Sequence, residues 1–316
     1  KLVAKMHKAI TIIQLKLEGQ LIERHPEWCM GKRDVFRMVD FDRGTVTIDG
    51  SEYELLDKNF PTVCGENPLS LTDAENELMS VLENSFMHSE RLNSHIRFLY
   101  SKGSMYKTIN GNLLFHGCIP LDENGQLQSV NIAGTDYSGK ALLDKLDEIA
   151  NKAYFMQPGE EKDYAADYMW YLWSGARSPL YGKDKMAFFE RYFLDDKKLH
   201  KENYNAYYHF SEQAEVCGWI LEMFGLDPER GHIINGHVPV KIKNGEKPVK
   251  AGGKLFVIDG GISKAYQKAT GIAGYTLIYD SHSLNLAEHK PFIAGESEHT
   301  PEIHLVERLE RRANIS

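Results

Sequence analysis

The sequence predicts a mixed α+β fold, and three features carry that prediction. Apolar residues recur at helical spacing through residues 2–22, which predicts an amphipathic helix. Two short apolar runs, 113–115 and 233–234, each lead into a turn that contains glycine and histidine, as a strand that opens into a loop does. Between them lies a helical, aromatic stretch, residues 140–224. Helices and short strands together define the α+β class.

Composition and charge limit the classes of protein to which this chain can belong. The 316 residues, 42% of them hydrophobic and 26% charged, are enough for a large core in one domain or two. A formal net charge of -8 argues against a nucleic-acid partner, and no apolar run reaches the roughly 18 residues of a membrane span. Because the chain starts inside the first predicted helix and without an initiator methionine, we expect it to be a piece of something longer.

The cysteines indicate a reducing compartment. They are widely spaced and form no CxxC pair, so neither a zinc knuckle nor a disulfide framework is predicted. A cytoplasmic location fits this usage best. The four are Cys29, Cys64, Cys118 and Cys217.

We divide the chain into three parts, residues 1–120, 121–230 and 231–316. In the first part, a short helix or extended lead over 33–42 precedes a hairpin over 44–56, and a helix runs from the N-cap Thr72 through Tyr100. A polar turn at 123–125 opens the second part. Further helices are predicted over 140–154, 163–173, 186–193 and 211–224, and further strands over 255–258 and 275–279, before a charged tail.

The two histidines that follow apolar strands, His116 and His237, are candidate metal ligands. Neutral imidazole is the commonest protein ligand for transition metals. Two ligands do not complete a catalytic metal site, which usually has three or more protein donors. The alternative is that each histidine is a hydrogen-bonded structural residue, which is the commoner role of a single histidine.

Several cationic and hydroxyl side chains lie in turns or at element ends, where they can bind phosphate. Most lysines and arginines are instead solvated surface charges, so those beside glycine and serine are the stronger candidates. The aromatic cluster at 164–173 indicates helix core rather than a stacking platform. The sequence contains no GxSxG, P-loop or GxGxxG motif. The phosphate candidates are Lys102, Ser104, Tyr106, Arg177, Ser178, Lys183, Arg191, Lys241 and Lys264.

Four long segments of the chain resemble a known family. They are MHKAITIIQLKLEGQLIERHPEW, KGSMY with NLLFHGCIPL, WYLWSGARSPLYGKDKMAFFERYF, and HIINGHVPVK with VIDGGISKAYQKATGIAGYTL. Together they resemble the C-terminal half of class III bacterial fructose-1,6-bisphosphatase, which is similar to the calcineurin-like metallophosphatases. The resemblance implies part of a two-sheet β-sandwich flanked by helices, with residues 121–230 as a helical cap. It also implies two divalent metal ions per site, with manganese as the expected metal.

The resemblance assigns roles to single residues. His116 in LLFHGCIP matches the family's histidine-glycine metal motif and His237 in NGHVPVK matches its later Gly-His motif, so both are expected on the same metal. The earlier motifs of the superfamily, Asp-x-His, Gly-Asp-x-x-Asp-Arg-Gly and Gly-Asn-His-Asp/Glu, do not occur. The general-acid histidine is therefore expected on an N-terminal half, as a separate polypeptide or upstream domain, and the fold is expected to be incomplete and inactive without it.

The function implied by the resemblance is hydrolysis of the 1-phosphate of fructose 1,6-bisphosphate to fructose 6-phosphate, a gluconeogenic step, in a cytoplasmic homo-oligomer without nucleic-acid or membrane partners. Two alternatives are a non-catalytic regulatory or sugar-phosphate-binding module and a phosphoprotein phosphatase. The long insertion over 121–230 argues against the phosphoprotein phosphatase, whose substrate groove would be open. The residues expected to contact substrate phosphate are Lys102, Ser104, Arg191, Lys241 and Lys264.

Overall fold

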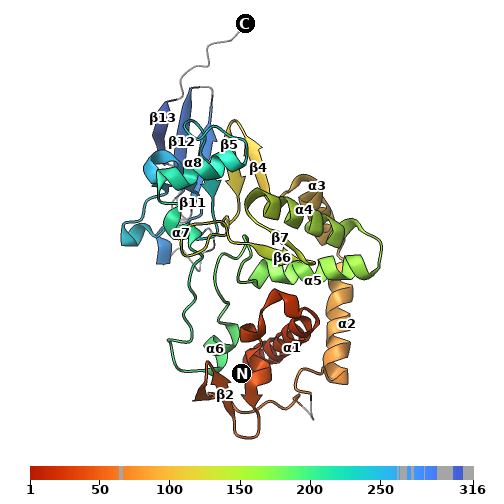
Figure 1. The fold of residues 1–316 in the computed structure, drawn as a ribbon. Helices are drawn as coiled ribbons and strands as arrows, with labels where there is room; N and C mark the ends of the chain where they lie inside the picture. The colour runs from red at the N-terminus through yellow and green to blue at the C-terminus, as the bar shows by residue number, and fades with distance from the viewer. Residues whose placement is uncertain are drawn as a thin grey trace, which may run out of the picture.

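The structure is a computed structural model that describes residues 1–63, 67–261, 263, 269–271, 274–280 and 282–289, with the backbone of 302–308. Helices and strands are mixed along the described residues, which confirms the α+β class (Figure 1). The two-sheet sandwich is not confirmed, because the described strands are divided among four sheets of three, five, three and two strands. None of the described helices is long and apolar enough to span a membrane.

The lower part of the molecule in Figure 1 is organised around α1 (Leu2–Arg24), the amphipathic helix that the sequence predicts. Its buried face packs against a small antiparallel sheet and α6 (Phe188–Phe193), in a core that includes Leu15, Phe36 and Phe189. The predicted hairpin is confirmed and turns at Asp49-Gly50, both with positive φ, as a two-residue hairpin loop requires. The remaining elements here are η1 (Pro26–Trp28), η2 (Gly31–Arg33), η3 (Val35–Met38), β1 (Val39–Asp40), β2 (Thr45–Ile48) and β3 (Ser51–Glu54).

The helix predicted from Thr72 through Tyr100 is two helices, α2 (Asp73–Met87) and α3 (Glu90–Lys102). Thr72 caps α2 in the predicted capping box. The single-helix prediction is wrong at Ser89, whose hydroxyl accepts from the backbone N–H of Leu92 at 3.4 Å and so starts a new helix. Helical periodicity continues across this break, and the pattern therefore could not reveal it.

The middle of the molecule is a helical layer. α4 (Gly139–Phe155) and α5 (Glu160–Ser174) form where they are predicted and bury Tyr168 and Tyr171 against the end of α1. The aromatic cluster is therefore mainly core, although Trp173 is half exposed. The hairpin of β6 (Val130–Ile132) and β7 (Thr135–Tyr137) was not predicted, because its turn places an alanine, Ala133, at positive φ.

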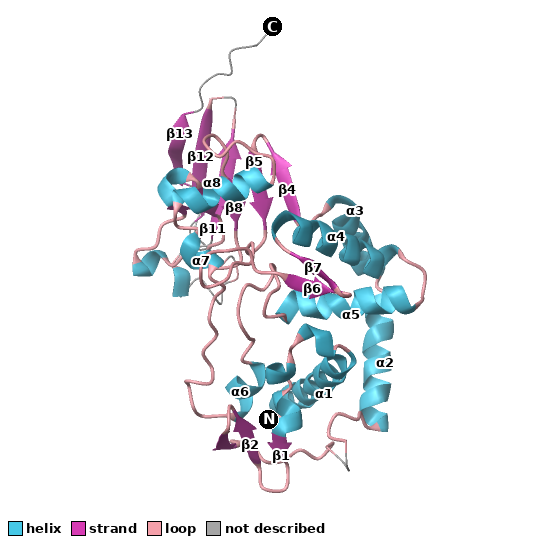
Figure 2. Cartoon of the chain, viewed as in Figure 1, coloured by secondary structure: helices cyan, strands magenta, loops and turns pink. Residues whose placement is uncertain are grey.

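The upper part contains a five-stranded sheet (Figure 2). Its strand order is β4 (Tyr106–Ile109), β5 (Asn112–Phe115), β8 (Ile233–Asn235), β10 (Leu255–Val257) and β9 (Val249–Lys250). β5, β8 and β10 are mutually parallel. One face packs on α8 (Ala214–Met223) and the short α7 (Tyr207–Phe210), while Ile234 and Phe256 on the other face contact Leu284 of a second sheet. Strands buried on both faces explain the continuous apolar runs.

The predicted strands at 113–115, 233–234, 255–258 and 275–279 are confirmed, while part of the expected charged tail forms two more strands. The strands of the two sheets are β4 (Tyr106–Ile109), β5 (Asn112–Phe115), β8 (Ile233–Asn235), β9 (Val249–Lys250), β10 (Leu255–Val257), β11 (Gly274–Tyr279), β12 (Ser283–His289) and β13 (Glu302–Arg308). Of the cysteines in the described ranges, Cys29, Cys118 and Cys217 are all free.

Candidate functional site

The three parallel strands of the central sheet bring His116, His237 and Asp259 to one edge. β5 leads directly into His116, β8 into Gly236-His237, and β10 into Ile258-Asp259. The carboxyl ends of parallel strands lie at the same edge of a sheet, where ligands of α/β sheets commonly bind. Two histidines that are 121 positions apart in the chain are therefore neighbours.

The two histidines are in direct contact, and we call them the histidine pair. Nε2 of His116 lies 3.1 Å from Nδ1 of His237, and their ring centroids are 4.9 Å apart. The backbone supports this geometry, because the N–H of Gly236 donates to the carbonyl of His116 at 2.9 Å. The side chain of Asn235 donates to the carbonyl of Gly117 at 3.1 Å and holds the two strand ends together.

The surroundings of His237 fix which ring nitrogen carries its proton. Nε2 of His237 lies 2.7 Å from the backbone carbonyl of Tyr181. A carbonyl only accepts, so Nε2 is the protonated nitrogen of a neutral His237 and Nδ1 presents its lone pair to His116. Metal-binding histidines typically donate their second N–H to such a partner.

The backbone of His237 is itself unusual. Its φ is 66°, in the left-handed region that non-glycine residues enter rarely. Such a conformation costs of order 1 kcal/mol and concentrates at functional sites. The residue is held there by its two ring contacts.

Burial keeps the histidine pair neutral. Burial lowers the pKa of His116, and the negative charge of Asp259 raises it by a smaller amount. Burial also lowers the pKa of His237, and the neighbouring His116 lowers it further, while the Tyr181 carbonyl raises it. A neutral imidazole is the form that binds a metal cation.

The histidine pair fits two positions of a metal site. Two nitrogens bound to one ion at about 2.1 Å and at a right angle lie about 3.0 Å apart, close to the 3.1 Å between the ring nitrogens. In the described part of the chain, no group of three or more His, Cys, Asp or Glu side chains could hold a metal ion. Among the described residues the pair therefore offers two imidazole donors, fewer than the three or more protein donors of a usual catalytic metal site.

A cavity of about 640 Å³ opens beside His116. Its size falls in the range of small-molecule sites. Lys102 and Ser104, two of the predicted phosphate contacts, line it together with His116 and Asn235. Leu99, Tyr100 and Met169 add apolar surface to the lining, and Lys107, Asp147 and Asn151 add further polar groups.

The other predicted phosphate contacts lie elsewhere. Lys241 lines a separate cavity of about 200 Å³, and Asn235 and Gly236 line both cavities. Arg191 lines neither; its Nη2 donates to the carbonyl of His200 at 3.0 Å and lies 3.5 Å from Glu202. Lys264 lies outside the described residues.

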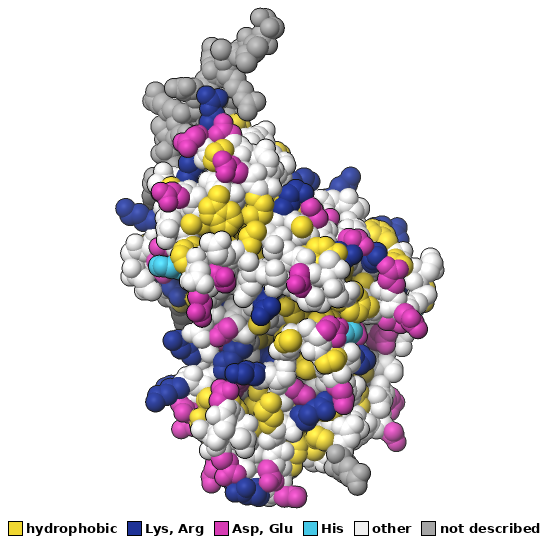
Figure 3. Space-filling model, in the orientation of Figure 1, with side chains coloured by type: hydrophobic (Ala, Val, Ile, Leu, Met, Phe, Trp, Pro, Cys, Tyr) yellow, Lys and Arg dark blue, Asp and Glu magenta, His cyan; other side chains and the backbone are white. Residues whose placement is uncertain are grey.

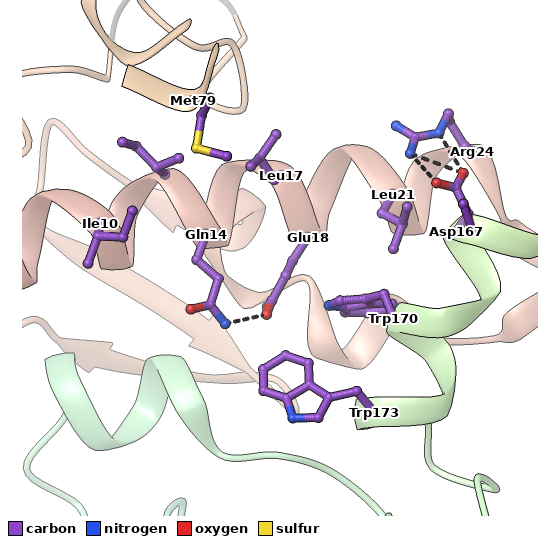
Figure 4. A pocket seen from close by; sticks show the side chains of 12 residues that line it. Ile10, Gln14, Leu17, Glu18, Leu21, Arg24, Met79, Asp167, Trp170 and Trp173 are labelled. Atoms are coloured by element: carbon purple, nitrogen blue, oxygen red, sulfur yellow. Dashed lines mark hydrogen bonds and ion pairs between the residues drawn. The ribbon is translucent and has the colours of Figure 1, made fainter. Parts of the chain in front are cut away.

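A further cavity of about 490 Å³ lies between α1, α2 and α5 (Figure 4). Its polar side chains are already paired: Arg24 binds Asp167 at 3.0 Å and Gln14 donates to Glu18 at 2.8 Å. The rest of the lining is largely apolar, with Trp170 and Trp173 facing α1. It therefore offers packing space rather than reactive groups.

Two groups at the histidine pair were missed by sequence reasoning. Asp259 follows an apolar strand just as the histidines do, and that pattern could have indicated it. The carbonyl of Tyr181 could not have been found, because a backbone oxygen has no sequence signature. On the face shown in Figure 3, acidic and basic side chains are interspersed.

Acidification is expected to destabilise the protein partly through the histidine pair. In the folded protein the pKa values of both histidines lie below the ordinary 6.5. At a pH between the folded values and 6.5, the unfolded chain therefore binds more protons than the folded protein. This contribution to stability is complete above the ordinary pKa and is lost as the pH falls toward the folded values. Urea unfolding at about pH 7.5 and about pH 5.5, with chelator present, measures it. The double variant His116→Gln/His237→Gln should lose less stability on acidification than the parent; an equal or larger loss contradicts the assignment.

A mixed fold whose parallel strands bring together a histidine pair, one member of which, His116, lines a cavity, has a small-molecule site typical of an enzyme. The chain belongs to the Firmicute fructose-1,6-bisphosphatase family, whose sequence model matches residues 1–315.

Named relatives agree with the family. The chain is 56% identical over 292 residues to "Fructose-1,6-bisphosphatase class 3" of Clostridium tetani, covering 92% of this chain and 44% of that protein. Proteins of the same name from Clostridium botulinum and Clostridium acetobutylicum are each 54% identical, over 93% and 94% of this chain and 45% of their own length. The chain thus spans slightly less than half the length of these relatives. No solved structure matches it.

The family match corrects one prediction. The chain was expected to be a C-terminal half that supplies only part of an active site and needs a missing N-terminal half. The family match does not support that prediction, since it takes in residues 1–315 and is not confined to one part of the chain. The prediction rested on motifs absent from the sequence, and an absent motif does not reveal which donors the fold brings together.

Proposed function

We propose that the protein hydrolyses a phosphate monoester, with fructose 1,6-bisphosphate as substrate and fructose 6-phosphate and phosphate as products. Membership of the family and the name of the relatives support this reaction. The observation that carries it is the contact between His116 and His237 at the joint edge of β5 and β8. Hydrolysis of a phosphate monoester needs a group that neutralises charge on phosphate, and a cation held by this pair meets that need.

We propose divalent metal ions as cofactors, two per site and with manganese first among them. His116 Nε2 and His237 Nδ1 would hold one of them. When bound, the metal would supply charge neutralisation and activation of water. The protein's own part is to keep both imidazoles neutral through burial and to fix the ring of His237 through the Tyr181 carbonyl. Likeness to the calcineurin-like metallophosphatases is part of the same proposal, supported by the contact between the two upper sheets.

The part of the 640 Å³ cavity that His116, Lys102 and Ser104 line is the proposed phosphate subsite. The ammonium group of Lys102 would offset phosphate charge, and the hydroxyl of Ser104 would donate to a phosphate oxygen. Ser104 Oγ donates to the carbonyl of Tyr106 in the absence of substrate, so it would exchange one acceptor for another. The apolar lining residues Leu99, Tyr100 and Met169 would exclude water from part of the substrate.

The remaining family expectations extend the proposal: a gluconeogenic role, a homo-oligomer and a cytoplasmic location. The reaction is tested by measuring phosphate release from fructose 1,6-bisphosphate by the purified protein, with and without added Mn²⁺. We expect Mn²⁺-dependent release that chelator abolishes. Release that is unaffected by chelator, or no release from this substrate at any Mn²⁺ concentration, contradicts the proposal.

A further inference from the structure

The loop after α5 reaches the histidine pair through a tight turn over residues 178–182. Its contact with the pair is the Tyr181 carbonyl, 2.7 Å from Nε2 of His237. The turn is closed by the N–H of Gly182, which donates to the carbonyl of Ser178 at 2.9 Å. The position of this turn therefore decides whether His237 finds its acceptor.

Two contacts anchor the turn on either side. The hydroxyl of Ser178, 1% exposed, donates to the carbonyl of Leu172 at the end of α5 at 2.5 Å. On the other side, the N–H of Cys118 donates to the carbonyl of Pro179 at 2.9 Å. The turn is thus pinned between α5 and the segment that leaves β5, two residues beyond His116.

Gly117 lies where these two segments come closest. A Cβ atom at this position would be 2.4 Å from the Pro179 carbonyl oxygen and 3.4 Å from the Leu180 carbonyl oxygen. The nearer separation is impossible without movement, and the obstacle is backbone, which yields less easily than a side chain. The φ of Gly117 is not in the left-handed region, so glycine is required here for space and not for conformation.

We propose that Gly117 is a positioning residue: its missing side chain lets the 178–182 turn approach β5, so that the Tyr181 carbonyl holds His237 as its Nε2–H tautomer. The consequence for cation binding rests on the proposed function. The tautomer itself does not depend on it, since the Tyr181 carbonyl is present without any metal. A displaced turn would free the ring to take the other tautomer, in which Nδ1 is protonated and cannot bind a metal.

The test is Gly117→Ala in the purified protein. ¹⁵N NMR of histidine-labelled, metal-free protein at neutral pH reports the tautomer, with the His237 signal assigned by its absence in His237→Gln. We expect the parent to show Nε2–H alone and Gly117→Ala to show a mixture of both tautomers. Mn²⁺ affinity, measured by electron paramagnetic resonance, should fall about 10- to 100-fold, the usual effect of losing a partner of a metal ligand.

Gly31→Ala is the matched control, because Gly31 has nothing within 4 Å of a Cβ and no left-handed φ. It should leave tautomer and affinity unchanged. If Gly117→Ala does not fold, Ser178→Ala is used in the same NMR experiment. This variant frees the turn from α5 without inserting atoms, so the same mixture of His237 tautomers is expected. A folded Gly117→Ala protein that keeps the pure Nε2–H form overturns the proposal. Absence of Mn²⁺ binding in the parent would instead contradict the proposed function. The positioning role of Gly117 would then be tested by the tautomer measurement alone.

Discussion

Replacing His237 with alanine is expected to abolish Mn²⁺ binding at the histidine pair and to lower phosphate release by more than about 100-fold. The expectation follows from contact geometry, because His237 Nδ1 is one of the two ring nitrogens at the candidate centre. Loss of a metal ligand should lower metal affinity and activity more than loss of the hydrogen-bond partner of a ligand, which typically lowers them 10- to 100-fold. Phosphate release at saturating Mn²⁺ and the Mn²⁺ dissociation constant are the measurements.

Two further variants separate chemistry from backbone strain. Because His237 has a φ of 66°, alanine there is strained as well as inert. Asparagine tolerates this conformation better, so His237→Asn should fold at least as well as His237→Ala and be equally inactive. His88→Ala, an exposed histidine at the end of α2, should behave like the parent. Full activity in His237→Asn contradicts the assignment.

The largest effect on stability is expected at Lys16, where Lys16→Met should cost about 3–5 kcal/mol. The side chain of Lys16 is completely buried in α1, with Nζ 2.8 Å from Glu75 and 2.7 Å from the carbonyl of Thr62. Methionine fills the space of the lysine chain but leaves the Glu75 carboxylate buried without a cation. Urea unfolding at neutral pH measures the loss.

An exposed ion pair provides the control. Lys8, which lies on the same helix as Lys16, pairs with Asp57 at 2.7 Å, but both side chains are partly solvated. Lys8→Met should therefore cost less than about 1 kcal/mol. Adding Glu75→Gln to Lys16→Met should recover part of the lost stability; equal costs for the two lysine variants contradict the account.

Acid should weaken the Lys16–Glu75 pair in the parent. Burial raises the pKa of Glu75, but hydrogen bonds from Lys16, Thr62 and Thr72 outweigh it, so the folded pKa lies below the ordinary 4.5. The stability from this pair is present above the ordinary carboxylate pKa and is lost as the pH falls through the folded value.

Local sequence pattern predicted the elements better than their arrangement. Continuous apolar runs located β5, β8 and β10, and spacing located α1, α4 and α5. The pattern failed where a single residue sets an element boundary or a turn. The hydroxyl of Ser89 starts a new helix, and Ala133 adopts a glycine-like φ in a hairpin turn. Such decisions depend on single hydrogen bonds and turn geometry, which periodicity does not encode.

The candidate site was predicted in part for the same reason. The sequence indicates each histidine as a polar residue after an apolar strand, but their contact depends on the parallel pairing of β5 with β8, which are separated by the 117 residues 116–232. Lys102 and Ser104 reach the cavity beside His116, while Arg191 does not. Pairing of distant segments follows from tertiary packing, so spacing alone could rank these residues but not place them.

Anomalous scattering at the manganese edge, from crystals of the protein grown with Mn²⁺, tests whether the histidine pair binds the cation. A peak is expected about 2.1–2.3 Å from both His116 Nε2 and His237 Nδ1. That peak should disappear in His237→Asn and persist in His88→Ala. A peak bound by neither histidine, or well-ordered imidazoles that remain in mutual contact with no peak at saturating Mn²⁺, would contradict the claim that the histidine pair binds the cation.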